Sequence, residues 1–349
     1  PPGTFVLVSG KLQRVPECRN PGEFDSRQFY GCQHIYYYLK NGKILKKSDS
    51  YFAYQQFLLN LKEKFNKVLQ ETAGEDAGTF QAIVLGDKEN LEEETKLRYQ
   101  MAGIVHILAI SGLHISIVGV GLYQLLMKTG LGIWGSGMLS LIVMLQYGMI
   151  TGGSVSTMRA VCMFLLAVGA KITGRIYDMP TGLAVAAMLI LGESGAYLYS
   201  SGFLMSFCAV LGIGVVFPSL QKLTGKRSRH HKKRFRQTRI REYSKNHSGS
   251  SKIQAALLSS LSVQLAMLPV LLYFYGEVSL AGIFLNLLVL PTAWIVLISG
   301  VITVLAGLIY IPAGILAAVP GRGLLFLYEK LCIITARLPF SNWIAGKPQ

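Results

Sequence analysis

Long runs without Asp, Glu, Lys or Arg dominate the chain from residue 99 onward. A helix needs about 20 apolar residues to cross the roughly 30 Å core of a bilayer, so most of these runs suffice for one crossing. Arg159 and Lys171 can reach the membrane surface from either end of the shorter run 160–170. We therefore predict a mostly α, polytopic helical membrane domain of about seven to nine spans with interrupted helices. The runs are Tyr99–Met127, Thr129–Met158, Met179–Gly192, Ser194–Gln221, Ile253–Gly276 and Val278–Gly321.

The first hundred residues have a different pattern, with no long apolar run and 13 of the 18 acidic residues. Short apolar stretches at Phe5–Val8, Lys43–Leu45 and Gln81–Leu85 predict strands between turn signals, and Tyr51–Leu69 predicts an amphipathic helix. We expect a small β-rich or α+β domain over residues 1–88, an amphipathic interfacial helix over 89–101 and the membrane domain over 102–345.

Composition supports the membrane assignment: 51% of residues are hydrophobic and only 15% are charged. The net charge of +16 lies mainly in residues 222–252, which hold 12 basic residues and one acidic residue. The positive-inside rule places this loop in the cytoplasm, and counting crossings back places residues 1–100 outside. In an oxidising exterior, Cys18 and Cys32 are candidates for a disulfide, with two free thiols as the alternative. The first residues, Pro1-Pro2-Gly3, indicate a piece of a longer protein.

Polar side chains interrupt the apolar run 102–121, where His106, Ser111 and His114 occur with Gly112. Such groups belong either in a wet cavity beside a broken helix or in close helix packing. Downstream, Ser156 and Arg159 follow a Gly/Ser/Thr turn. Arg159 at the head of a helix suits an anion contact, or else reaches to lipid phosphate. Asn286 and Pro291 interrupt the longest run.

Catalysis and metal binding are weaker interpretations of these residues. Ser111 and His114 share a helix face, but no G-x-S-x-G elbow or acidic partner accompanies them. His106 and His114 lie eight residues apart without an evident third ligand. We therefore assign no catalytic residue, no metal site and no cofactor. The basic loop 222–252 suits either nucleic acid or, as the favoured interpretation, a solvated topology signal.

Several segments together resemble one family, the ComEC competence proteins, over most of the chain. The matching segments are AIVLGD at Ala82–Asp87, GIVHILAISGLH at Gly103–His114, STMRA at Ser156–Ala160, GFLMSF at Gly202–Phe207, NLLVLP at Asn286–Pro291 and, upstream, NPGEFD at Asn20–Asp25. Two positions depart from the family pattern: Val155, where proline is frequent, and Leu204, where glutamine is frequent. The H-x-H-x-D-H signature of the metallo-β-lactamase-like nuclease domain found in many members is absent from this chain.

The resemblance implies a channel that carries single-stranded DNA into the cytoplasm during natural transformation. It also implies an exterior OB-like domain at residues 1–88, an exterior DNA receptor and a cytoplasmic helicase or single-strand-binding protein as partners. Aromatic and basic side chains would hold the strand outside, at Tyr36, Tyr38, Lys43, Lys46 and Lys47. The residues expected to line or shape the path are His106, Ser111, Gly112, His114, Ser156, Arg159 and Asn286. The alternatives are a transporter or flippase for another anionic solute or lipid, and an intramembrane hydrolase using Ser111 and His114.

Overall fold

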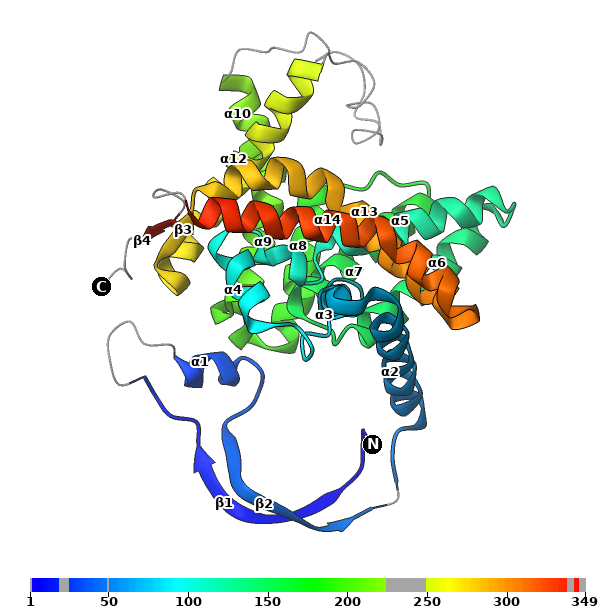
Figure 1. The fold of residues 1–349 in the computed structure, drawn as a ribbon, viewed down its shortest axis with the longest axis vertical. Coiled ribbons are helices and arrows are strands. Elements are labelled where there is room, and N and C mark those ends of the chain that lie inside the picture. Colours follow the sequence, from blue (N-terminus) through cyan, green and yellow to red (C-terminus); the bar gives the residue numbers. More distant parts are fainter. Residues whose placement is uncertain (1, 19–24, 49, 224–248, 338–341, 345–349) are drawn as a thin grey trace.

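The computed structural model describes residues 2–18, 25–48, 50–223, 249–337 and 342–344, which form a helical body with a long β-hairpin beside it (Figure 1). The predicted cytoplasmic loop 222–252 lies mostly outside the described residues, as does most of the NPGEFD segment. The elements in chain order are β1 Val6–Arg14, α1 Ser26–Gly31, β2 Tyr37–Lys47, α2 Ala53–Ala73, η1 Gly74–Asp76, α3 Ala77–Leu85, α4 Glu93–Met101, η2 Val105–Leu108, α5 Gly112–Lys128, α6 Gly132–Ile150, α7 Val155–Ile172, α8 Met179–Glu193, η3 Gly195–Tyr199, α9 Ser201–Leu211, η4 Gly212–Val216, α10 Phe217–Leu223, α12 Gly249–Tyr275, β3 Glu277–Ser279, α13 Ala281–Ile309, α14 Ile311–Ala336 and β4 Asn342–Ile344.

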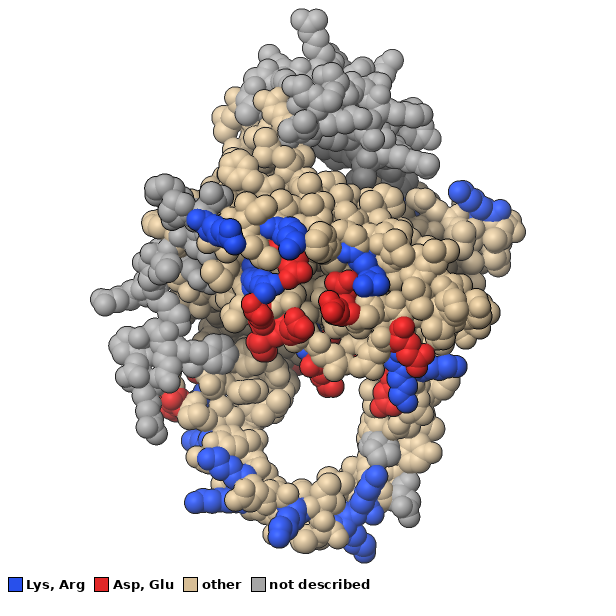
Figure 2. Space-filling model, in the orientation of Figure 1, with Lys and Arg blue, Asp and Glu red and all other residues tan. Residues whose placement is uncertain are grey.

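Strands β1 and β2 pair antiparallel from Val6 opposite Lys47 to Arg14 opposite Tyr37, with two irregularities in the register. The hairpin curves away from the body, and an opening separates the two in Figure 2. The two strands contain six basic residues, two in β1 and four in β2, and no acidic residue. Basic side chains are therefore spaced along the hairpin, whereas on the facing part of the body acidic and basic side chains lie together (Figure 2).

Helices α2 and α3 pack against α13 and α14. Phe80 of α3 is fully buried, and its ring occupies the space left by Gly300 of α13 and Gly321 of α14. The strand predicted at Gln81–Leu85 is therefore wrong: these residues end helix α3, whose apolar side chains are buried on nearly every side. The helix predicted at Tyr51–Leu69 is confirmed as α2. Within the stretch 89–101, residues Glu93–Met101 form helix α4, and its position at the membrane interface stays a prediction.

The polytopic architecture predicted from the apolar runs is confirmed. Within the described residues, six helices are long and apolar enough to span a membrane, at 132–150, 155–172, 201–223, 254–275, 281–309 and 311–336. Helix α5 has 17 residues because the run 102–121 is broken before Gly112, and α8 has 15 because it stops at Glu193. These two shorter helices account for the difference from the predicted seven to nine spans.

The buried apolar residues separate into three clusters. The first joins α2, α3 and η2 to α13 and α14. The second lies among α5, α6 and α7, and the third among α7, α8 and α9. Helix α7 therefore contributes to two clusters, one on each side.

Candidate functional site

The predicted interruption in the run 102–121 is present between η2 and α5. Ala109 has extended backbone angles, φ −114° and ψ 140°, so the helical turn of η2 stops there and α5 begins at Gly112. Ser111 precedes the first helical residue, and its backbone N–H donates to Nδ1 of His114 at 3.0 Å. The Ser111 Oγ lies 2.9 Å from the same nitrogen. His114 thus acts as the third-residue partner of a capping box, which satisfies an amide that the broken helix leaves open.

This geometry also fixes the proton on His114. A backbone amide only donates, so Nδ1 must be the unprotonated ring nitrogen and the neutral ring carries its proton on Nε2. The lone pair that would accept the Ser111 hydroxyl proton is therefore already shared with an amide. Residues 99–177 contain no Asp or Glu to orient the other ring nitrogen. The pair is well explained as a helix cap.

Arg159 lies in the first turns of α7 and is 5% exposed. Its Nε and Nη1 make no hydrogen bond within the protein, and none of the ion pairs among described residues includes it. A methyl group on Gly112 would lie only 2.8 Å from Nη2. On the other side, the guanidinium carbon is 5.9 Å from the ring centre of Phe207. A buried cation without a carboxylate is costly, so it marks a position suited to an anion.

The α9 ring beside Arg159 belongs to a stacked pair. The Phe203 and Phe207 rings have centroids 4.2 Å apart and planes inclined by 28°. Both are buried, and the Oγ of Ser206 between them is buried without a hydrogen-bond partner. We call Gly112, Arg159, Phe203 and Phe207 the Arg159 seam. Sequence reasoning missed the two phenylalanines, because the only signal was that GFLMSF belonged to the resemblance.

Other segments of the resemblance meet near this seam. Gly86 ends α3 in the left-handed conformation with φ +70°, and a Cβ there would lie 2.9 Å from the Thr151 carbonyl oxygen and 3.1 Å from Ile110. The Tyr147 hydroxyl donates to the Val84 carbonyl at 2.7 Å. The C-terminal end of α3 therefore packs against both the turn before α7 and the break before α5.

Glycines bring the start of α13 to the same region. A Cβ on Gly103 would lie 3.1 Å from the Cα of Gly282 and 2.8 Å from Ser279. Asn286, one turn further along α13, has a buried Oδ1 without a partner. Segments spread from residue 82 to residue 291 therefore converge on the interrupted region at 103–114.

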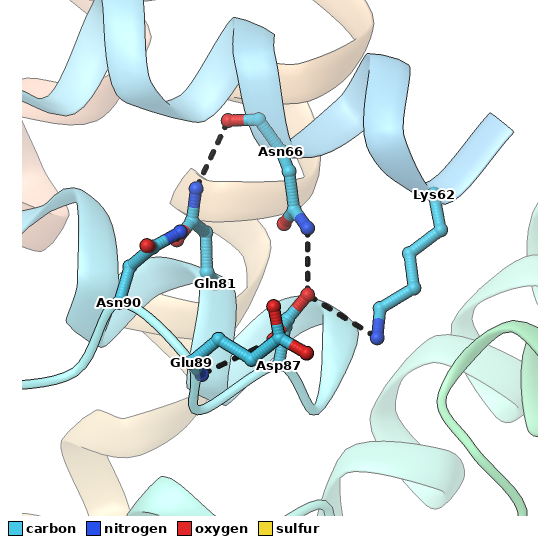
Figure 3. Close-up of polar contacts among 6 residues, drawn as sticks. All are labelled: Lys62, Asn66, Gln81, Asp87, Glu89 and Asn90. Carbon is cyan, nitrogen blue, oxygen red and sulfur yellow. Dashed lines mark hydrogen bonds and ion pairs between the residues drawn. The ribbon is translucent and has the colours of Figure 1, made fainter. Parts of the chain in front are cut away.

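A polar network fixes the end of α3 (Figure 3). Oδ2 of Asp87 accepts from Nδ2 of Asn66 at 2.7 Å and lies 3.2 Å from Nζ of Lys62. Its Oδ1 accepts from the Glu89 amide at 3.2 Å. Gln81 is fully buried and donates to the Asn66 carbonyl at 3.0 Å. Burial alone would raise the pKa of the Asp87 carboxyl, but the bonds from Asn66, the Glu89 amide and Lys62 together lower it below 3.8. We call Lys62, Asn66, Gln81, Asp87 and Glu89 the Asp87 network.

The remaining predicted site residues are more scattered. His106 in η2 and Ser156 in the first turn of α7 are half-buried. Of the predicted exterior contacts, Tyr36 is exposed, Tyr38 is half-buried and the lysines are exposed on β2, at Lys43, Lys46 and Lys47. The candidate disulfide is not formed: Cys18 and Cys32 are both free thiols, and the Cys32 Sγ lies 3.1 Å from the carbonyl oxygen of Ala196.

Two shallow hollows lie away from the Arg159 seam. One, of about 340 Å³, is lined by residues of α5, α6 and α7 and the turn after α7, including Tyr123, Lys171 and Arg175. The other, of about 300 Å³, lies on the hairpin around Phe5 and Lys46. The seam residues line neither hollow and are packed between helices. Among the described residues, no group of three His, Cys, Asp or Glu side chains is placed to hold a metal ion.

Comparison with known proteins places this arrangement in a family. The model of the family described as "Competence protein" matches residues 83–349. The chain belongs to the competence protein family. Membership agrees with the resemblance drawn from the five segments between residues 82 and 291, and the six long apolar helices make this competence protein a multi-pass membrane protein.

One curated protein similar in sequence to this competence protein is "ComE operon protein 3" of Bacillus subtilis (strain 168). The two are 25% identical over 293 residues, which cover 83% of this chain and 34% of the relative. The chain thus spans about a third of the relative's length. No solved structure matches the chain.

Proposed function

We propose that this chain forms the membrane path through which single-stranded DNA passes into the cytoplasm during natural transformation. Membership of the competence protein family supports a role in DNA uptake, and the multi-pass helical body supplies a membrane-embedded scaffold. The observation that carries the proposal is the buried Arg159 guanidinium, where the family's segments converge and where two nitrogens, Nε and Nη1, make no hydrogen bond within the protein.

The chemistry of the seam suits a phosphodiester better than a neutral solute. A guanidinium presents a planar set of donors that matches phosphate oxygens, and its charge is permanent. Residues 99–177 contain no carboxylate that would repel a polyanion.

The exterior part of the path is assigned to the hairpin. Its strands contain basic residues and no acidic ones, and Lys40 lies 6.0 Å from the Tyr38 ring centre. Single strands bind to such surfaces by stacking on aromatic rings and by phosphate contacts. In this proposal residues 1–100 face outside and the loop 222–252 faces the cytoplasm. An exterior DNA receptor then delivers the strand, and a cytoplasmic helicase or single-strand-binding protein receives it.

Transport also requires movement, because His114 and Arg159 are packed rather than exposed to a hollow. The proposal treats the described arrangement as the closed one. Opening then moves Phe207 of α9 away from Arg159 of α7, which exposes the guanidinium to the strand.

The test is uptake of fluorescent DNA by competent cells that lack only this protein and carry it back on a plasmid. Wild type should restore uptake, Arg159→Gln should abolish it, and Arg159→Lys should retain a part. DNA bound at the cell surface should be equal in all three strains. Full uptake with Arg159→Gln would remove Arg159 from the path, and uptake in the uncomplemented strain would overturn the proposed function.

The 2.9 Å contact between Ser111 Oγ and His114 Nδ1 is the observation behind a second candidate function, an intramembrane hydrolase. Ser111→Ala removes the only nucleophile of that candidate. A channel should lose little uptake, whereas a hydrolase should lose all turnover on its substrate. A flippase or transporter for another anion would instead show Arg159-dependent movement of that anion without any effect on DNA uptake.

A further inference from the structure

The Arg159 seam lies where two packed clusters meet on helix α7. Ala160 and Val161 belong to the cluster of α5, α6 and α7, whereas Phe203 and Phe207 belong to the cluster of α7, α8 and α9. Arg159 is in contact with both, because Gly112 lies on the first side and the Phe207 ring on the second. Arg159 is therefore the point on α7 where the two clusters meet.

The two sides of Arg159 differ in chemistry. On the α5 side the guanidinium meets a glycine, which offers no side chain and leaves the backbone within reach. On the α9 side it meets the face of an aromatic ring, at a distance where the attraction is modest. A phosphate oxygen bound directly to a buried guanidinium is a much stronger partner than a ring. The Phe207 contact is therefore one that an arriving phosphate displaces.

We infer that Phe203 and Phe207 form the hydrophobic gate of the path, and that a phosphodiester of single-stranded DNA bound to Arg159 opens it. This inference rests on the proposed function and adds the closing element to it. Apolar constrictions close a pore by excluding water, and two stacked rings that are both buried make such a constriction.

The gate also has a use once it is open. When α9 moves away from Arg159, the phenylalanine faces become available for stacking against bases, while the guanidinium holds the phosphate. Stacking is tolerant of sequence, as a general DNA path requires. The unpartnered Oγ of Ser206, which precedes Phe207 on the same helix, gains a partner in the strand or in water.

The experiment measures ion leak through the full chain reconstituted in vesicles of phosphatidylethanolamine and phosphatidylglycerol, without DNA. Wild type should be tight. Phe207→Ala should raise the leak of potassium and chloride, and Phe207→Trp, which keeps a large ring beside Arg159, should stay tight. Phe164→Ala is the matched control, since Phe164 is a buried phenylalanine of α7 that packs on Gly119 in the other cluster.

A second measurement links the leak to Arg159. In the Phe207→Ala background, adding Arg159→Gln should shift the leak from chloride toward potassium, because the fixed positive charge at the constriction is gone. In wild type, added oligothymidylate should raise the leak, and the same concentration of inorganic phosphate should not.

A tight Phe207→Ala protein with a wild-type thermal unfolding midpoint would overturn the gate, as would an equal leak from Phe164→Ala. Where Phe207→Ala fails to fold, Phe207→Leu takes its place and should leak to a lesser degree. A tight Phe207→Leu protein would then overturn the gate. A Phe207 variant that does not leak, together with normal DNA uptake by the wild-type protein, would refute the gate but not the proposed function. A Phe207 variant that leaks, together with a wild-type protein that supports no DNA uptake, would refute the proposed function.

Discussion

The amide nitrogen of Ser111 donates a 3.0 Å hydrogen bond to the Nδ1 of His114, three residues further along the chain. The bond joins the last residue before α5 to the third residue inside it, so it defines where the second half of the broken helix begins. An imidazole in this role keeps a polar group at the break without a charge, which suits a site inside a membrane.

This bond predicts that His114→Gln is tolerated better than His114→Ala. A glutamine at the third helical position accepts from the same amide, whereas alanine leaves the amide open and costs about 1 kcal/mol. Thermal unfolding in detergent should show the loss for alanine and little change for glutamine, and DNA uptake should follow the same order. Equal and complete loss of uptake with both variants would instead indicate a role for the imidazole itself.

Gly112→Ala should disturb Arg159. The added methyl would lie 2.8 Å from Nη2, so the guanidinium must move or the helices must separate. We expect DNA uptake to fall while the protein stays inserted in the membrane. Gly121→Ala in the same helix is the control, since a Cβ there meets nothing within 4 Å and uptake should be unchanged. Similar uptake by both variants would argue against a close fit at the seam.

The hairpin lysines should contribute sequence-independent DNA binding. Changing Lys43, Lys46 and Lys47 to alanine removes three exposed cations, and each phosphate contact contributes about 0.7 to the salt slope for a single strand. The slope of log binding constant against log salt should therefore become shallower by about 2. Fluorescence anisotropy of labelled oligothymidylate with the full chain in nanodiscs measures it. Lys64→Ala and Lys67→Ala on α2 form the control, and an unchanged slope in the triple variant would remove the hairpin from the DNA surface.

The Asp87 network predicts an acid-dependent loss of stability. The carboxylate is the form that the folded chain stabilises, because its pKa is lowered there from 3.8. Its contribution is present above about pH 4 and is lost as the pH falls through the lowered value. Asp87→Asn should destabilise the protein at pH 7 and equal wild type at strongly acidic pH. Unfolding midpoints across this range test it, with the exposed Glu89→Gln as control. A stability difference that persists undiminished at acidic pH would refute the charge-based account.

Phe80→Ala should be among the most destabilising substitutions in the body. The ring is fully buried against Gly300 and Gly321, and removing such a ring leaves a cavity that costs about 3–5 kcal/mol. Phe57 of α2 is 60% exposed, so Phe57→Ala should change stability by no more than about 0.5 kcal/mol. Chemical unfolding in detergent compares the two. A small effect at Phe80 would mean that α3 is only loosely docked on α13 and α14.

The break before α5 could be predicted from the sequence, because Ser111, Gly112 and two histidines stand inside an otherwise apolar run. The contacts between Ser111 and His114 are local, three residues apart, so spacing alone pointed to this pair. The burial of Arg159 beside Phe207 could not be predicted in this way. The two residues are 48 positions apart, and only the packing of α7 on α9 brings them together.

The error at Gln81–Leu85 has a different origin. A run of four or five apolar residues fits a strand or a buried helix equally well, and its neighbours decide which one forms. Here the glycines of α13 and α14, more than two hundred residues later, leave room for a helix carrying Phe80. The small extent of β-structure in the first hundred residues follows from the same packing, since α2 and α3 join the helical body.

The curved hairpin has a consequence for how the protein behaves once purified. In the described part of the chain it is a ribbon of two strands, so each strand keeps an outer row of backbone groups, and apolar side chains such as Leu7 and Ile44 are 60% and 67% exposed. Such ribbons readily join edge to edge with their own kind. Self-association of the purified protein in detergent is therefore expected from the ribbon alone. A proline on an outer edge of the ribbon would block this edge-to-edge pairing. Only then does the particle mass measured in detergent report the oligomeric state in the membrane.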